Sequence, residues 1–229
     1  FLFDLTIAHD WLSAMGGIAI KRELGLPFAF HVHSTEKGRT MGNGSEVVSN
    51  IEMRASQTAD IIVTVSNAMK DELIGLGFPA EKIRVVYNGV DPDKYSPREV
   101  SKEEIQKIRQ RYGLNDDDLM ILFFGRLVWV KGVDKLIAAM PHVLQKIPNA
   151  KLVIVGLGDM QDYLVRLAQN LKVQDHVKFR FDFIPEEERI AHYAACDLAV
   201  FPSIYEPFGI VAIEAMSMEK PVVVGASGV

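Results

Sequence analysis

The stretch LMILFFGRLVWVKGVDKLIAAMPHVLQKIPNAKLVIVG, residues 119–156, contains two short apolar runs separated by a longer helical pattern. The two runs, 119–125 and 151–156, are continuously apolar, which is expected for parallel strands that are covered on both faces. Strands that alternate with helices in this way predict an α/β fold built on parallel sheets.

The same alternation continues on both sides of this stretch. Further strands are expected at 27–32, 60–66, 82–88, 177–183, 197–203 and 221–225. Helices are expected near 11–23, 67–76, 101–112, 133–147, 160–171, 186–195 and 208–219. The whole chain therefore predicts doubly wound α/β sheets.

A charged segment with turn residues interrupts this rhythm at 88–118, where two prolines follow the pair Asn88-Gly89. We interpret 89–117 as a linker between two Rossmann-like domains, 1–88 and 118–229. A hinge there predicts a ligand cleft between the domains, outside the carboxyl ends of the strands. Because the chain does not begin with Met and ends directly after an apolar run, both domains are expected to be truncated.

The composition excludes some classes of protein. With 48% hydrophobic and 24% charged residues, the 229-residue chain predicts a globular protein with a sizeable core. A net charge of -5 argues against a nucleic-acid partner. No apolar run reaches the ~18 residues of a spanning helix, so no membrane segment is expected. The single cysteine, Cys196, forms no intrachain disulfide and has apolar neighbours, which predicts a buried thiol and a cytoplasmic location.

The segment YEPFGIVAIEAM, residues 205–216, offers two carboxylates beside a helix start. If the helix begins at Pro207, Glu206 and Glu214 lie about 12 Å apart along its axis. Free N–H groups between them would form an anion site at Phe208, Gly209 and Ile210. A carboxylate, a group of free N–H donors and a second carboxylate thus follow one another along the chain, which suits a sugar, a pyrophosphate and a ribose in that order. The alternative is a capping Glu206 and a solvated Glu214, although the apolar neighbours of Glu214 favour burial with a polar partner.

Two cations flank the loop that follows the strand at 119–125. Arg126 and Lys131 can converge on one phosphate, since Arg supplies a planar fork and Lys a point charge. The alternative is a pair of exposed surface charges.

Five segments together resemble the retaining glycosyltransferases of GT-B fold, in the large group that includes glycogen and starch synthases. The segment at 205–216 resembles their Glu-x7-Glu signature. The other four are VHSTEKGR (32–39), VSNAMKDEL (65–73), VYNGVD (86–91) and FGRLVWVKGVDKLI (124–137). The resemblance covers nearly the whole chain and implies two Rossmann-like domains facing across a cleft, with the acceptor side in 1–88 and the nucleotide-sugar donor site in 118–229.

The resemblance also implies the reaction and its residues. A hexosyl group, glucosyl in the first place, would pass from a nucleoside diphosphate sugar to a sugar or glucan acceptor with retention. Departure of the diphosphate would be assisted by Arg126, Lys131 and the helix amides, in a loop that starts at Gly125. Glu206 would hold sugar hydroxyls and Glu214 the ribose. No cofactor and no metal are expected, and this chain alone is expected to be inactive.

A histidine, His33, stands at the carboxyl end of the strand expected at 27–32. The resemblance places His33 beside the transferred sugar, and His31, two residues earlier on the same strand, is a rival assignment. His9 and Asp10 resemble a strand-end motif of the synthases and are candidates for the acceptor side, with core packing as the alternative.

Other interpretations remain open at this point. Gly156 and Gly158 follow a strand as in a dinucleotide fingerprint, but Gln161 stands where the third glycine belongs, so a nicotinamide oxidoreductase fits poorly. The resemblance instead brings both glycines close to the donor. Asp91 and Asp93 imitate a metal-binding Asp-x-Asp but fit a turn better. A non-catalytic nucleotide-sugar-binding module is a further alternative, and the base, ADP or UDP, is unassigned.

Overall fold

The computed structural model describes residues 3–225, which form two compact units. Of these residues, unit 1 contains 3–88 and 205–208, and unit 2 contains 89–204 and 209–225. The division thus falls directly after Asn88, and the residues expected to form a linker, 89–117, group with unit 2. Within residues 3–225, no helix has both the length and the apolar character needed to cross a membrane.

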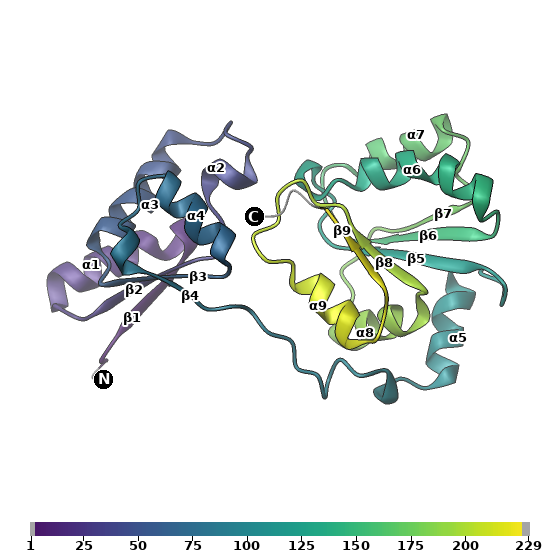
Figure 1. Ribbon diagram of the computed structural model, residues 1–229, viewed down its shortest axis with the longest axis horizontal. Coiled ribbons are helices and arrows are strands. Elements are labelled where there is room, and N and C mark those ends of the chain that lie inside the picture. Colours follow the sequence, from purple (N-terminus) through teal and green to yellow (C-terminus); the bar gives the residue numbers. More distant parts are fainter. Residues whose placement is uncertain (1–2, 226–229) are drawn as a thin grey trace. The chain divides into compact units, whose positions relative to one another are not determined.

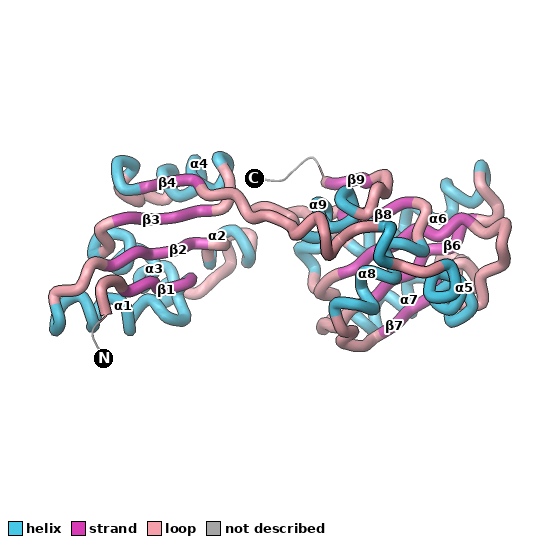
Figure 2. Tube along the Cα trace, turned by 90° about the horizontal axis from the view of Figure 1, so that it is seen from below, coloured by secondary structure: helices cyan, strands magenta, loops and turns pink. Residues whose placement is uncertain are grey.

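Unit 1 is built on a four-stranded parallel sheet. Its strand order follows the chain: β1 (Thr6–His9), β2 (Phe28–Val32), β3 (Ile61–Thr64) and β4 (Ile83–Val85). Figure 2 shows these strands side by side, with β1 and β4 at the two edges. The crossover helices are α1 (Asp10–Leu24), α3 (Glu46–Thr58) and α4 (Asn67–Gly75). Since successive right-handed crossovers step in one direction, these helices lie on one face of the sheet.

Short helical turns complete unit 1. The helix α2 (Glu36–Arg39) follows β2, and the 3-10 helix η1 (Ala80–Lys82) leads into β4. The Thr35 hydroxyl caps α2 by accepting a hydrogen bond from the Gly38 N–H.

Unit 2 is a doubly wound sheet of five parallel strands. The strand order is β7 (Val177–Arg180), β6 (Ala150–Val155), β5 (Leu119–Phe124), β8 (Leu198–Phe201) and β9 (Val222–Val224). The helices α6 (Val133–Lys146) and α7 (Gln161–Asn170) cover one face. Figure 1 shows α5 (Lys102–Arg111), α8 (Glu186–Ala195) and α9 (Ile210–Ser217) on the other. Two 3-10 helices, η2 (Pro97–Glu99) and η3 (Trp129–Lys131), precede α5 and α6.

The winding of unit 2 reverses between β5 and β8. The chain moves outward from β5 through β6 to β7 and then returns to β8 on the other side of β5. The loops that leave the carboxyl ends of β5 and β8 therefore run to opposite faces. Such a switch point opens a crevice at the edge of the sheet, where α/β proteins bind ligands.

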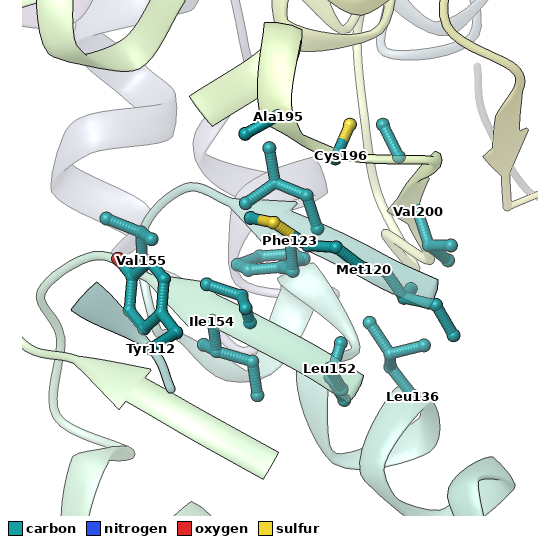
Figure 3. Packing of buried hydrophobic residues seen from close by; sticks show 14 of the residues in the cluster. Tyr112, Met120, Phe123, Leu136, Leu152, Ile154, Val155, Ala195, Cys196 and Val200 are labelled. Atoms are coloured by element: carbon teal, nitrogen blue, oxygen red, sulfur yellow. The ribbon is translucent and has the colours of Figure 1, made fainter. Parts of the chain in front are cut away.

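The core of unit 2 explains the continuous apolar runs of the sequence. Residues on both faces of β5 and β6 are buried, among them Met120, Phe123, Leu152 and Ile154 (Figure 3). Cys196 packs in the same core at 1% exposure, which confirms the predicted buried thiol.

The structure contains all eight predicted strands, but the prediction missed β1 and α3. In α3 the buried residues are Glu52, Ala55 and Ser56, so its inner face lacks the large apolar side chains that produce a helical periodicity. The strand β1 is short, and only one of its four residues is buried.

Candidate functional site

The loop after β5 is held against the loop after β8. Gly132 ends η3 with φ +64° and precedes α6, and a Cβ there would lie 2.2 Å from the carbonyl oxygen of Pro202. The Ile204 N–H also donates to the Val130 oxygen at 2.7 Å. Only glycine therefore fits at position 132, and the two loops of the switch point form one surface.

Arg126 and Lys131 lie in this first loop. Arg126 is exposed directly after the strand, whereas Lys131 is half-buried in η3. The structure thus places both predicted cations on one loop at the carboxyl edge of the unit 2 sheet, where a cationic site suits a diphosphate.

Gly125, Gly156 and Gly158 bring the loops after β5 and β6 together. A Cβ at Gly156 would lie 1.8 Å from the Gly125 oxygen, and one at Gly158 would lie 2.1 Å from the Leu127 oxygen. The Leu127 N–H donates to Leu157 at 2.8 Å, and Leu127 accepts from Met160 at 3.1 Å. Backbone packing thus accounts for the glycine pattern that suggested a nicotinamide enzyme; a donor contact of these glycines stays a prediction.

The helix α9 begins later than predicted. Its N-cap is Gly209, with φ +84° and ψ 59°, and its first residue is Ile210. Pro207 therefore does not open the helix, and the axial spacing of about 12 Å between the two glutamates, which assumed a continuous helix, does not apply. The left-handed Gly209 turns the chain sharply into α9. The N–H groups of Ile210 and Val211 then stand at the positive end of the helix.

Glu206 and Phe208 lie in the segment that precedes this turn. Both side chains are partly exposed, and the segment 205–208 groups with unit 1 while the residues on either side group with unit 2.

Glu214 is buried among polar partners. Its side chain accepts a hydrogen bond from the Tyr193 hydroxyl at 2.9 Å. The Tyr95 hydroxyl lies 3.1 Å from the same carboxylate and 2.9 Å from that of Glu186, so it donates its one proton to either of them. An Arg189 Nη2 lies 3.3 Å from the Glu214 carboxylate. Glu214 is only 5% exposed, so the predicted burial with a polar partner is confirmed and the solvated alternative is wrong.

The partners of Glu214 are themselves fixed. The Arg189 guanidinium lies 5.5 Å from the ring centre of Phe124 and 5.8 Å from that of Tyr95. Burial raises the pKa of both Tyr95 and Tyr193, so their hydroxyls stay protonated and act as donors. The result is a rigid carboxylate on α9.

The residues that hold Glu214 were not predicted from the sequence. Tyr193 lies in the buried last part of α8, where a hydroxyl needs a hydrogen-bond partner. Glu186 and Arg189 have the spacing of an ion pair on the same helix. Both features could have been recognised in the sequence. Tyr95 lies 119 residues from Glu214 in a segment interpreted as a linker, and it carried no signal.

In unit 1 the structure brings three histidines together. His9 ends β1, and the parallel register places it opposite His31 on β2. His9 Nδ1 lies 2.9 Å from His33 Nε2, and the ring centres of His31 and His33 are 4.0 Å apart. The predicted residues His9 and His33 are thus neighbours, and the rival His31 belongs to the same cluster.

Asp10 fixes the backbone of this cluster. Its carboxylate accepts a hydrogen bond from the His33 N–H at 2.8 Å, and its own backbone is left-handed, with φ +52°. Aspartate is one of the few residues that adopt this conformation readily. Burial, together with the neighbouring His33 and His9, lowers the pKa of His31 to about 4.

The Asp91-Pro92-Asp93 segment forms a turn. An Asp91 carboxylate oxygen accepts from the Asp93 N–H at 3.0 Å, so this carboxylate stabilises the turn as expected.

Comparisons with known proteins agree with this architecture. Residues 104–229 match the family described as glycosyl transferases group 1, and residues 1–94 match glycosyltransferase family 4. The chain is 39% identical to an uncharacterized glycosyltransferase of Methanocaldococcus jannaschii, over 99% of this chain and 58% of that protein. It is 33% identical to a glycogen synthase of Mycobacterium tuberculosis, over 98% of this chain and 52% of that protein.

Among solved structures, Anabaena HepE in complex with UDP and glucose is similar to this chain with a TM-score of 0.86 and 28% identity. The match covers 99% of this chain and 60% of HepE, so the chain spans little more than half the length of the relatives it matches. The two parallel α/β units have the fold of GT-B glycosyltransferases, which confirms the predicted fold class. The chain belongs to the glycosyl transferases group 1 family.

Proposed function

We propose that this chain carries the donor site, and part of the acceptor side, of a retaining hexosyltransferase. The donor is a nucleoside diphosphate sugar, with glucose as the first candidate, and the acceptor is a sugar or glucan. The observation that supports this most directly is the gathering of Arg126, Lys131 and the N-terminus of α9 at the switch point of unit 2.

The chemistry of the leaving group explains why these groups belong together. When the bond between the sugar and the diphosphate breaks, negative charge grows on the departing oxygen. Fixed cations and helix N–H groups stabilise that charge without rearrangement and so lower the barrier. Arg126 and Lys131 supply the positive charge, and for this reason we propose that transfer needs no metal ion.

The ribose contact is proposed for Glu214. An ionised carboxylate has about four acceptor sites, and Tyr95, Tyr193 and Arg189 engage at most three of them. The remaining site can accept a ribose hydroxyl. Because its partners hold the carboxylate rigidly, little conformational entropy is lost when a ribose binds.

The sugar itself is assigned to Glu206 and His33. Glu206 would accept hydrogen bonds from sugar hydroxyls, and His33 would contact the sugar near the reacting carbon. His9 and Asp10 would line the acceptor side. No residue is assigned as a covalent nucleophile, so retention is proposed to occur by attack from the face that the diphosphate leaves.

The relatives suggest which base and which sugar to test first. HepE is described in complex with UDP and glucose, and the mycobacterial relative is named a glycogen synthase. We therefore propose UDP-glucose as the first donor to test. ADP-glucose, which carries the other base that the sequence leaves open, is the second.

Calorimetry on this chain with UDP, ADP and NAD tests the donor site. We expect UDP or ADP to bind, NAD not to bind, and Arg126→Gln to weaken nucleotide affinity about 10- to 100-fold. Arg166→Gln, which changes an exposed arginine on α7, is the matched control and should have no effect. Binding of NAD without either nucleotide would overturn the proposal.

Transfer is tested with the full-length protein and a panel of donors. We expect one nucleotide sugar to be consumed only when a sugar or glucan acceptor is present, with the anomeric configuration followed by NMR. If full-length protein bound a nucleotide sugar but transferred no sugar to any acceptor, the non-catalytic binding module would be the correct description.

A further inference from the structure

Three imidazole rings converge at the carboxyl edge of the unit 1 sheet. One ring nitrogen each from His9, His31 and His33 lies within 4.8 Å of the other two. The ring centre of His9 lies 4.9 Å from that of His31 and 5.2 Å from that of His33. Histidine makes up six of the 229 residues, so half of the histidines of this chain meet at one point.

The backbone holds this cluster in place. His9 and His31 are direct partners in the parallel register of β1 and β2, so their side chains project from the same face of the sheet. The His9 N–H donates to the Ser13 hydroxyl at 2.7 Å, and Asp10 accepts from the His33 N–H at 2.8 Å. The three rings are therefore fixed by two strand ends and the first turn of α1.

Hydrogen bonds within the protein do not satisfy all the ring nitrogens of these three histidines. Among the residues that the structure describes, the buried His31 Nε2 has no hydrogen-bond partner. His9 Nδ1 and His33 Nε2 face each other at 2.9 Å and can share only one proton. A buried ring nitrogen without a protein partner is unusual in a native structure and calls for a water molecule, an ion or another ligand.

We propose that His9, His31 and His33 bind a divalent transition-metal ion, Zn²⁺ in the first place, with water as the fourth ligand. Zinc binds imidazole nitrogens at about 2.0–2.1 Å in tetrahedral geometry, which separates the ligand nitrogens by about 3.4 Å. The His9–His33 pair at 2.9 Å must open by a few tenths of an ångström, and the widest pair must close.

The chemistry of the ligands selects the ion. Neutral imidazole suits Zn²⁺, Cu²⁺ and Ni²⁺, whereas Mg²⁺ and Ca²⁺ require oxygen ligands. This ion is therefore distinct from a Mg²⁺ on the diphosphate, and the proposal is compatible with transfer that needs no metal. If the role proposed above for His33 is correct, zinc and the sugar compete for this histidine, and the ion is a reversible inhibitor.

Binding is tested on this chain after chelator treatment and dialysis. We expect one Zn²⁺ per chain by calorimetry, and the visible absorption of tetrahedral Co²⁺ when cobalt replaces zinc, with no heat from Mg²⁺. His9→Gln, at an exposed position, and His31→Gln should each weaken Zn²⁺ binding at least 10-fold. His142→Gln, on α6 of unit 2, is the matched control and should bind like the wild type.

Circular dichroism must show that each variant is folded. Absence of stoichiometric Zn²⁺ binding, or equal binding by the wild type and both cluster variants, would overturn the proposed metal site. Inhibition is a separate measurement on the full-length enzyme: Zn²⁺ should lower the transfer rate and EDTA should restore it. Stoichiometric binding without inhibition would retain the metal site and instead contradict the proposed contact between His33 and the sugar.

Discussion

Replacing Glu214 by glutamine removes a negative charge from a buried site while leaving its shape nearly unchanged. In the wild type this carboxylate accepts from Tyr193, lies 3.1 Å from the Tyr95 hydroxyl and pairs with Arg189 at 3.3 Å. The amide has one oxygen in place of two, so one tyrosine hydroxyl faces an NH₂ group. Arg189 loses its most buried counter-ion and, among residues 3–225, keeps the more distant Glu186 at 3.5 Å.

The magnitude follows from these contacts. Breaking a buried ion pair by removing one partner costs about 3–5 kcal/mol when the remaining charge is left alone. Arg189 is only partly buried and retains a second carboxylate, so we expect a loss of about 2 kcal/mol in the free energy of unfolding. If Glu214 also accepts from the ribose, nucleoside diphosphate affinity should fall about 10- to 100-fold.

The assay combines urea denaturation with calorimetric titration of UDP and ADP. Glu187→Gln, an exposed glutamate on α8, is the matched control and should change neither quantity. A Glu214→Gln variant that unfolds at the wild-type urea concentration and binds nucleotide normally would refute the reasoning about this site. Lost stability with normal affinity would refute only the ribose contact.

Four further outcomes are expected. Glu206→Gln in the full-length enzyme should lower kcat strongly while affinity for free nucleoside diphosphate stays unchanged, and an equal loss of affinity would contradict the sugar contact. EDTA should leave transfer intact; loss of activity that Mg²⁺ or Mn²⁺ restores would show that the diphosphate needs a metal. Burial, then Arg180 and Arg111, lowers the pKa of His192 to about 3. The folded state therefore favours neutral His192, and the free energy of unfolding should fall as pH drops from about 6.5 towards 3, by up to ~1.4 kcal/mol per pH unit. Urea titrations of the wild type and of His192→Gln at several pH values check this. If both proteins lose stability equally with falling pH, His192 is not the source of the loss. Gly158→Ala should lower Tm, because the new Cβ would lie 2.1 Å from the Leu127 oxygen. Gly16→Ala in α1 should not lower Tm, because its Cβ would meet no outside atom within 4 Å. Equal Tm values for the two variants would contradict the close loop packing.

Local patterns were sufficient for much of the fold. The continuous apolar runs that became β5 and β6 are buried on both faces, so their composition alone indicated parallel strands. The prediction failed where burial does not follow hydrophobicity. The inner face of α3 contains Glu52, whose carboxylate accepts from the Glu36 N–H at 2.9 Å, and no pattern in the sequence announces that contact.

The candidate site was predictable in its residues more than in its geometry. Arg126 and Lys131 lie on one loop, because eight residues of chain between a strand and a helix leave them little freedom. The start of α9 was predicted wrongly, because Pro207 is a good first residue of a helix and only the left-handed backbone of Gly209 moves the start to Ile210.

The sequence by itself determined the α/β class, the parallel strands and the order of family-like segments, because each of these is encoded by residues close together in the chain. Tertiary structure decided the rest. The order of strands in the sheet creates the switch point between β5 and β8, and the register of β1 with β2 sets His9 beside His31. Tyr95 reaches Glu214 across 119 residues of sequence. Such contacts depend on which distant segments become neighbours when apolar surface is buried, and no local pattern records that choice.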